Sequence, residues 1–170
     1  MIKRGPDLSV LPVMADREVT LPDGRRIYVQ RHEVTIREWK VCVAQKGCTL
    51  ALRVRPDQDP ATTPATGLNY VDAQEYVAWI NATTDNTFRL PTAEEWQYIA
   101  APVMPEKPDP LFTDPSLTWA SAYLVEGIAP RALKPQGSFS TTPYGISDLD
   151  GSVWEWTQGC YVGDLENNRC

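Results

Sequence analysis

A short aromatic and acidic motif near the end of the chain limits the folds that it can adopt. Trp154, Glu155 and Trp156 follow a turn-forming stretch that ends at Gly151. On an extended chain the two tryptophans point to one side and Glu155 points to the other. A carboxylate that two large aromatic side chains frame in this way is either buried with a partner or bound to a metal. The motif therefore indicates an extended segment and a carboxylate with a specific role.

Size and charge exclude several classes of protein. The chain has 170 residues, of which 42% are hydrophobic, and this suits one globular domain with its own core. Its net charge of -6 and its pI near 4.8 argue against nucleic acid or an anionic membrane as the main partner. No apolar run approaches the roughly 20 residues that span a bilayer. The first residues lack the apolar core of a secretory signal, so a signal is either absent or already removed.

The four cysteines fall into two local pairs. Cys42 precedes Cys48, and Cys160 precedes Cys170. This even, local pairing predicts two short-loop disulfides and therefore an oxidising compartment. The alternative is four free thiols in a cytosolic protein. Zinc is disfavoured, because there is no CxxC motif and the single histidine, His32, lies in an expected strand.

Residues 1–16 show no clear periodicity, and we expect a loosely held N-terminal extension there, followed by one domain over residues 17–170. Residues 17–31 are predicted to form a hairpin. The Asp23-Gly24 pair between two apolar runs is a strong hairpin signal.

Three helices are predicted from their N-terminal capping residues. Thr35, Asn69 and Thr92 each precede a run of apolar residues at helical spacing, and Gly47 is expected to end the first helix. The residues expected to face the core are Trp39, Cys42, Val43, Ala73, Tyr76, Val77, Ile80, Trp96 and Ile99. Two proline-rich stretches, residues 49–66 and 101–118, are predicted to be ordered loops. Short helices, a hairpin and long loops together predict an α+β fold.

Five motifs in a fixed order resemble the formylglycine-generating-enzyme-like (sulfatase-modifying-factor) family over about residues 31–161. They are Glu33-Val34-Thr35, Asp72-Ala73, Arg89-Leu90-Pro91-Thr92 with Glu95-Trp96, Gly137-Ser138-Phe139 with Tyr144-Gly145-Ile146, and residues 151–156. The resemblance implies a variant of the C-type lectin fold, rich in loops, with short helices and small antiparallel sheets. Ala93 stands where the family has a glutamate, and Ser152 stands where it has an asparagine.

The resemblance also implies that the domain is truncated at its C-terminus. The family continues past the Trp-Glu-Trp segment with a further strand, whereas this chain stops at Cys170. We therefore expect a fragment, or a domain that a separate C-terminal segment or protein partner completes, rather than a protein that does without the strand. A core built for a closing strand would otherwise expose an apolar edge.

The resemblance places a calcium site on Asp148, Gly151, Val153 and Glu155. Asp148 and Glu155 would supply side-chain oxygens, while Gly151 and Val153 would supply carbonyls, which are the hard ligands that Ca²⁺ prefers. Alternation along an extended strand would direct residues 151, 153 and 155 to one side. The alternative is that Asp148 caps a turn and Glu155 pairs with an arginine, such as Arg89.

No catalytic residue can be named from the sequence. Copper-dependent oxidation, as in the family's best-known members, needs a reactive thiol pair, and Cys160 and Cys170 are more simply explained as a structural disulfide. Copper is therefore expected only if the missing C-terminal segment carries a cysteine pair. With one histidine, the chain also cannot supply the iron ligands of the related sulfoxide synthases.

Two functions remain open. One is a family domain that acts on or with a partner protein in an extracytoplasmic maturation process, in a periplasmic or secreted location. The other is a non-catalytic, calcium-stabilised binding or ligand-display module.

Overall fold

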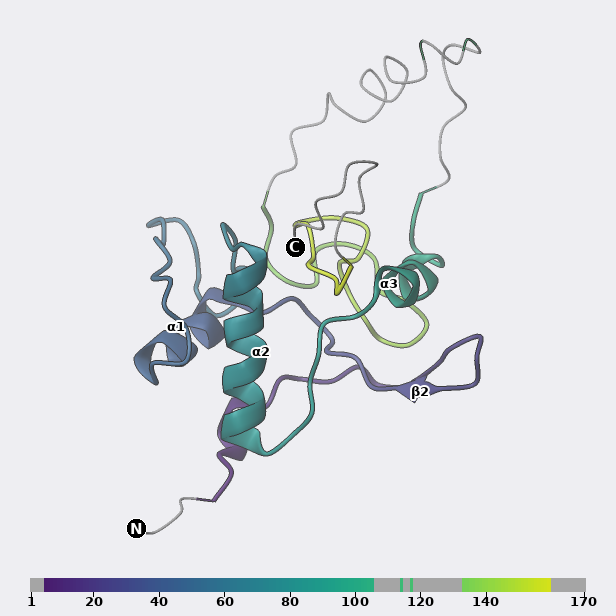
Figure 1. Cartoon of the computed structure of the whole chain (residues 1–170). Coiled ribbons are helices and arrows are strands. Elements are labelled where there is room, and N and C mark those ends of the chain that lie inside the picture. Colours follow the sequence, from purple (N-terminus) through teal and green to yellow (C-terminus); the bar gives the residue numbers. More distant parts are fainter. Residues whose placement is uncertain (1–4, 106–113, 115–116, 118–132, 160–170) are drawn as a thin grey trace.

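The computed structural model describes residues 5–105, 114, 117 and 133–159. A short 3₁₀ helix, η1 (Leu8–Val10), precedes strands β1 (Val19–Thr20) and β2 (Arg26–Ile27) and helices α1 (Ile36–Ala44), α2 (Tyr70–Thr84) and α3 (Ala93–Ala100). Figure 1 shows α1 and α2 together on one side of the molecule, with β2 and α3 on the other. The α+β class is thus confirmed.

The predicted hairpin is present at the expected turn. Val19 pairs with Ile27 and Thr20 pairs with Arg26 in an antiparallel arrangement. The turn contains Gly24 at a φ of +85°, a backbone angle that glycine adopts without strain.

The segment before the hairpin is joined to the rest of the chain, although we expected it to be loosely held. The Ala15 amide donates to the Val29 carbonyl at 2.8 Å, and the Arg31 amide donates to the Val13 carbonyl at 2.8 Å. These two bonds pair the chain before β1 with the chain after β2, so the antiparallel pairing of the hairpin resumes beyond the two named strands.

All three predicted helix starts are confirmed, each with a complete capping box. Thr35 and Glu38 form the box of α1, Asn69 and Asp72 form that of α2, and Thr92 and Glu95 form that of α3. In each, the cap side chain accepts from the third residue's amide and that residue's carboxylate accepts from the cap amide.

The end of α1 differs from the prediction. The helix stops at Ala44, and Lys46 takes the left-handed conformation, with a φ of 62°. Gly47 is needed for a different reason: a Cβ atom there would lie 2.3 Å from Cδ1 of Trp79. The glycine therefore permits the close approach of α2 rather than ending the helix.

The buried apolar residues form two separate cores. The α1–α2 core contains Trp39, Cys42, Cys48, Tyr76, Trp79 and Ile80. The hairpin–α3 core contains Val19, Leu21, Ile99, Ala100, Ile146 and Leu149.

Within the α1–α2 core, Trp39 stacks on Tyr76 with ring centroids 5.7 Å apart, and Tyr76 also contacts Trp79. The connecting residues 49–66 contain no helix or strand beyond a single bridge between Pro64 and Thr35, as predicted from their prolines.

Candidate functional site

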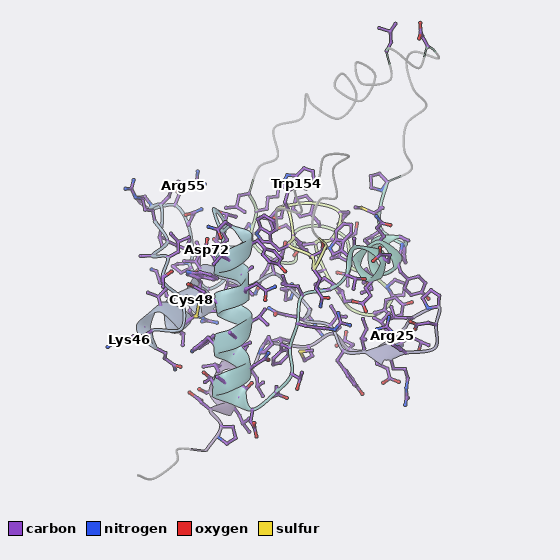
Figure 2. All side chains as sticks on the ribbon, viewed as in Figure 1. Arg25, Lys46, Cys48, Arg55, Asp72 and Trp154 are labelled. Carbon is purple, nitrogen blue, oxygen red and sulfur yellow. A yellow bond between two sulfur atoms is a disulfide. The ribbon has the colours of Figure 1, made fainter. Side chains whose placement is uncertain are left out.

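A cavity of about 760 Å³ separates the two cores. Core residues from both sides line it: Trp39, Tyr76 and Ile80 from the α1–α2 core, and Ile99, Ile146 and Leu149 from the hairpin–α3 core. In Figure 2, Cys48 marks the α1 side of the molecule, Arg25 marks the hairpin side, and Trp154 lies between them. Three carboxylates gather beside this cavity, and we refer to Glu33, Asp148 and Glu155 as the acidic cluster.

Asp148 is the most deeply buried member of the acidic cluster. Its side chain is fully enclosed and its backbone is left-handed, with a φ of 71°. The backbone amide of Phe139 donates to Oδ1 at 2.8 Å, and the amide of Gly137 donates to Oδ2. Asp148 therefore fixes the preceding loop against the core.

His32 lies beside Asp148 without a hydrogen bond to it. Its Nδ1 atom is 3.8 Å from Oδ2 of Asp148, which is too long for a hydrogen bond, and this buried nitrogen has no other partner within the described parts of the chain.

Glu155 accepts a hydrogen bond of 2.9 Å from Nε1 of Trp96. Much of the residue's surface is accessible, since it faces the cavity, but many protein atoms surround its carboxylate. Burial accordingly raises the pKa of Glu155, and the charge of Asp148 raises it further, while the bond from Trp96 opposes the shift.

Glu33 completes the acidic cluster, and sequence reasoning did not identify it as a site residue. Both of its carboxylate oxygens are buried and accept no hydrogen bond from the residues that the structure describes. Burial, followed by the charges of Asp148 and Glu155, raises the pKa of Glu33 to about 7. Only a protonated Glu33 could donate to Asp148, because two ionised carboxylates are both acceptors. The motif Glu33-Val34-Thr35 was recognised from the sequence, but no local signal reveals the long-range neighbours of this glutamate.

The four predicted calcium ligands do not form a regular alternating strand. Residues 151–153 form a bend, in which the Val153 amide donates to the Gly151 carbonyl at 2.9 Å and Ser152 has a φ of 61°. Glu155 and Val153 line the cavity, whereas Asp148 is turned toward the loop amides. Within the described parts of the chain, no group of three or more His, Cys, Asp or Glu residues is placed to hold a metal ion.

The arginine proposed as an alternative partner of Glu155 is used elsewhere. Arg89 forms two bonds to the carboxylate of Glu95, at 2.7 and 2.8 Å. These bonds lower the pKa of Glu95 to about 2. Glu155 is left with Trp96 as its hydrogen-bond donor.

Of the two predicted disulfides, Cys42–Cys48 is confirmed. It joins the last turn of α1 to the chain that follows and is buried in the α1–α2 core. Cys160 and Cys170 lie outside the described residues, so their pairing stays a prediction.

Comparison with known proteins defines the class of this protein. A family model of the sulfatase-modifying factor enzyme 1-like domain matches residues 14–168, and the chain belongs to this family. It is 31% identical over 108 residues to the formylglycine-generating enzyme of Mycobacterium tuberculosis. The aligned region covers 58% of this chain and 34% of that enzyme. It is 29% identical over 122 residues to the inactive C-alpha-formylglycine-generating enzyme 2 of Bos taurus. The aligned region covers 62% of this chain and 36% of that protein.

The chain spans about a third of the length of these curated relatives. No solved structure matches it, so the C-type lectin-like variant of the fold is not confirmed by comparison. In the portion of the chain that the structure describes, no helix is long and apolar enough to cross a membrane.

Proposed function

We propose that this chain acts on or with a partner protein in an extracytoplasmic maturation process, using a lectin-like variant of its α+β fold. The cavity between the two cores carries this proposal. It is about 760 Å³ in size and apolar core residues face it from both sides. A volume in this range suits a small ligand or a short length of polypeptide.

The Cys42–Cys48 disulfide supports a periplasmic or secreted location. Disulfides persist in oxidising compartments and are rare where thiols are kept reduced.

Site-specific photo-crosslinking in the native host tests the partner. Benzoylphenylalanine placed at Val77, which lines the cavity, should give one adduct that mass spectrometry identifies as the same protein in repeated experiments. The same probe at Lys46, an exposed residue beyond α1 that does not line the cavity, is the matched control. Adducts that are absent at Val77, or equal at both positions, would contradict the proposal.

A non-catalytic binding or ligand-display module is the second candidate function. It is favoured because both cysteines within the described residues are locked in the buried Cys42–Cys48 bond. Copper chemistry would therefore need a thiol pair from elsewhere, such as a further C-terminal segment. Incubation of the chain with a cysteine-containing peptide, copper and oxygen decides between the two candidates. Aldehyde formation on the peptide supports an enzyme, and its absence supports the binding module.

Calcium is part of the proposal, with Asp148, Gly151, Val153 and Glu155 as the residues that would hold it. The donor types suit calcium, because carboxylate and carbonyl oxygens are the ligands that it prefers, and a cation would offset the mutual charge of Asp148 and Glu155. Bound calcium would supply charge neutralisation and rigidity to the loop that leads to Trp156.

Thermal unfolding in calcium and in chelator tests the ion. A ligand that binds only the folded state at a hundredfold excess over its Kd stabilises that state by about 2.7 kcal/mol. Calcium should therefore raise the Tm of the wild type but not that of Glu155→Gln, and terbium luminescence sensitised by Trp96 should follow the same pattern. Equal Tm values in calcium and chelator, with no terbium signal, would remove calcium from the proposal.

A further inference from the structure

We propose that an exposed basic surface beside α1 docks an acidic segment of the partner protein. Four cations make up this surface, and none of them lines the cavity: Arg37, Lys40, Arg53 and Arg55, which we call the basic surface. The inference rests on the proposed function, since it assumes that the chain works with a partner protein. It adds a second place of contact and the chemistry of the segment that binds there.

The charge of the chain is distributed unevenly. The whole chain has a net charge of -6, yet the stretch from Ile36 to Pro56 contains five lysines and arginines and a single acidic residue, Glu38. The carboxylate of Glu38 is occupied in the capping box of α1, where it accepts from the amide of Thr35 at 2.7 Å. The α1 side is therefore a cationic region on an otherwise acidic molecule.

The cations of the basic surface are not neutralised by neighbouring carboxylates. Arg37, Lys40 and Arg53 form no ion pair with any other residue that the structure describes. Arg55 has one partner, Asp57, at 3.5 Å, and both of these side chains are exposed. An exposed pair of this kind contributes little to stability, so Arg55 can exchange Asp57 for a carboxylate of a partner.

Arg37 and Lys40 lie on the same face of α1. They are three residues apart in the helix and both are exposed, and residues at this spacing are neighbours on a helix surface.

The loop after α1, residues 50–60, is held at both ends against the same part of the helix. Nε1 of Trp39 donates to the carbonyl of Leu50 at 2.8 Å. The amide of Arg37 donates to the carbonyl of Pro60, also at 2.8 Å. Figure 1 shows this part of the chain on the α1 side of the molecule. The loop therefore runs beside the part of the helix that carries the first two cations.

Exposure alternates along the first half of this loop. Leu50 and Leu52 are half-buried and pack against the α1–α2 core. Arg53 and Arg55 are exposed. Two residues apart on an extended segment, these arginines point to the same, outward side. In Figure 2, Arg55 lies at the outer edge of the α1 side, and Lys46 lies at the other end of that edge.

The main chain of the loop also has groups available for a partner. The amides and carbonyls of residues 51–54 form no hydrogen bond with any other residue that the structure describes. A segment of another protein can pair with such groups by strand addition. Acidic side chains at alternate positions of that segment would then lie opposite Arg53 and Arg55, as oppositely charged pairs do across neighbouring strands.

A short acidic protein segment fits this surface better than a membrane or a nucleic acid. The acidic remainder of the chain would repel an extended polyanion, whereas a short segment contacts the basic surface alone. Three of the four cations are arginines, and a guanidinium group forms two parallel bonds with a carboxylate.

Selection from a random peptide library displayed on phage, with the whole chain as the target, tests the inference. The wild type should enrich peptides with carboxylates at alternating positions. Synthetic peptides of that consensus should bind at low salt and more weakly as the salt concentration rises, because salt screens exposed charges. Replacing both Arg53 and Arg55 with glutamine should weaken binding by about fivefold or more.

A double variant with Arg17→Gln and Lys46→Gln is the matched control. It removes the same charge from two exposed positions outside the basic surface, and it should leave peptide binding unchanged. Both double variants should remain folded, because the substituted side chains are exposed. Thermal unfolding curves check this.

The inference is overturned if no peptide is enriched, if the enriched peptides lack acidic residues, or if the folded Arg53 and Arg55 double variant binds them as well as the wild type does. Binding of heparin or of phosphatidylserine vesicles through the same arginines, without enrichment of acidic peptides, would also overturn it, in favour of a different anionic partner. The proposed function fails separately, if the cavity position Val77 gives no specific crosslink in the host.

Discussion

Gly47 and Gly151 each lie against an aromatic ring that a Cβ atom would overlap. The ring is that of Trp79 for Gly47 and that of Phe139 for Gly151, at 2.3 Å in both cases. From the sequence, each position had a local role, a helix end for Gly47 and the end of a turn for Gly151. The actual reason at each is a close contact with an aromatic side chain outside the local turn, which no local pattern reveals.

We expect Gly47→Ala to destabilise the protein by about 1–3 kcal/mol, because the added methyl group must displace Trp79 from the α1–α2 core. Urea unfolding followed by tryptophan fluorescence measures the change. Gly5→Ala is the control, since a Cβ atom there meets nothing within 4 Å. Equal urea unfolding midpoints for the two variants would show that Trp79 can move aside without loss of stability.

The bond between Arg89 and Glu95 should make stability depend on pH. The pKa of Glu95 is lowered to about 2 from its ordinary value of 4.5, so the stabilisation that its bond to Arg89 provides is fully present above pH 4.5. That contribution is lost as the pH falls toward 2.

Arg89→Met should therefore cost about 1–2 kcal/mol at pH 7, a figure reduced because Arg89 is 42% exposed. The deficit relative to the wild type should narrow as the pH falls from 4.5 toward 2. Arg25→Met, at 3.4 Å from the same carboxylate and more exposed, should have a smaller effect. Urea unfolding at a series of pH values checks this, and a deficit that does not change with pH would be the contrary result.

At the scale of the elements, the sequence predicted what local chemistry determines. Each helix begins at the capping residue that the sequence indicated, because the cap and its acidic partner lie three residues apart. The hairpin turn was equally local. Two of the three members of the acidic cluster were predicted, since Asp148 and Glu155 came from a resemblance. Glu33 joins them through tertiary folding, from about 115 residues earlier in the chain than Asp148.

The disulfide between α1 and the following loop should contribute about 2 kcal/mol to stability, by the chain-entropy model for a loop of this length. Replacing both Cys42 and Cys48 with alanine should lower the unfolding midpoint accordingly. Peptide mapping of the unreduced protein should show the Cys42–Cys48 link directly. If Cys42 and Cys48 are alkylated without prior reduction, the bond is not formed in the protein.

At the scale of the whole molecule, the main contacts between helices and strands of the described residues stay within one core or the other. Helix α1 contacts α2, α2 contacts η1, and β1 contacts β2, while α3 belongs to the other core. Figure 1 shows the same separation of α1 and α2 from β2 and α3. The cavity between the cores is therefore the place where a bound segment would couple the two halves, which no periodicity in the sequence could have predicted.

Because of this separation, we expect the two halves to open independently in the free protein. Ile80 and Ile99 are equally buried, at 3% exposure, one in each core. Ile80→Val and Ile99→Val should each cost about 0.5–1.5 kcal/mol. In native-state hydrogen exchange, Ile80→Val should speed exchange of the α2 amides and spare those of α3, and Ile99→Val should do the reverse. If either variant speeds exchange equally in both helices, the cores unfold as one cooperative unit even when the cavity is free.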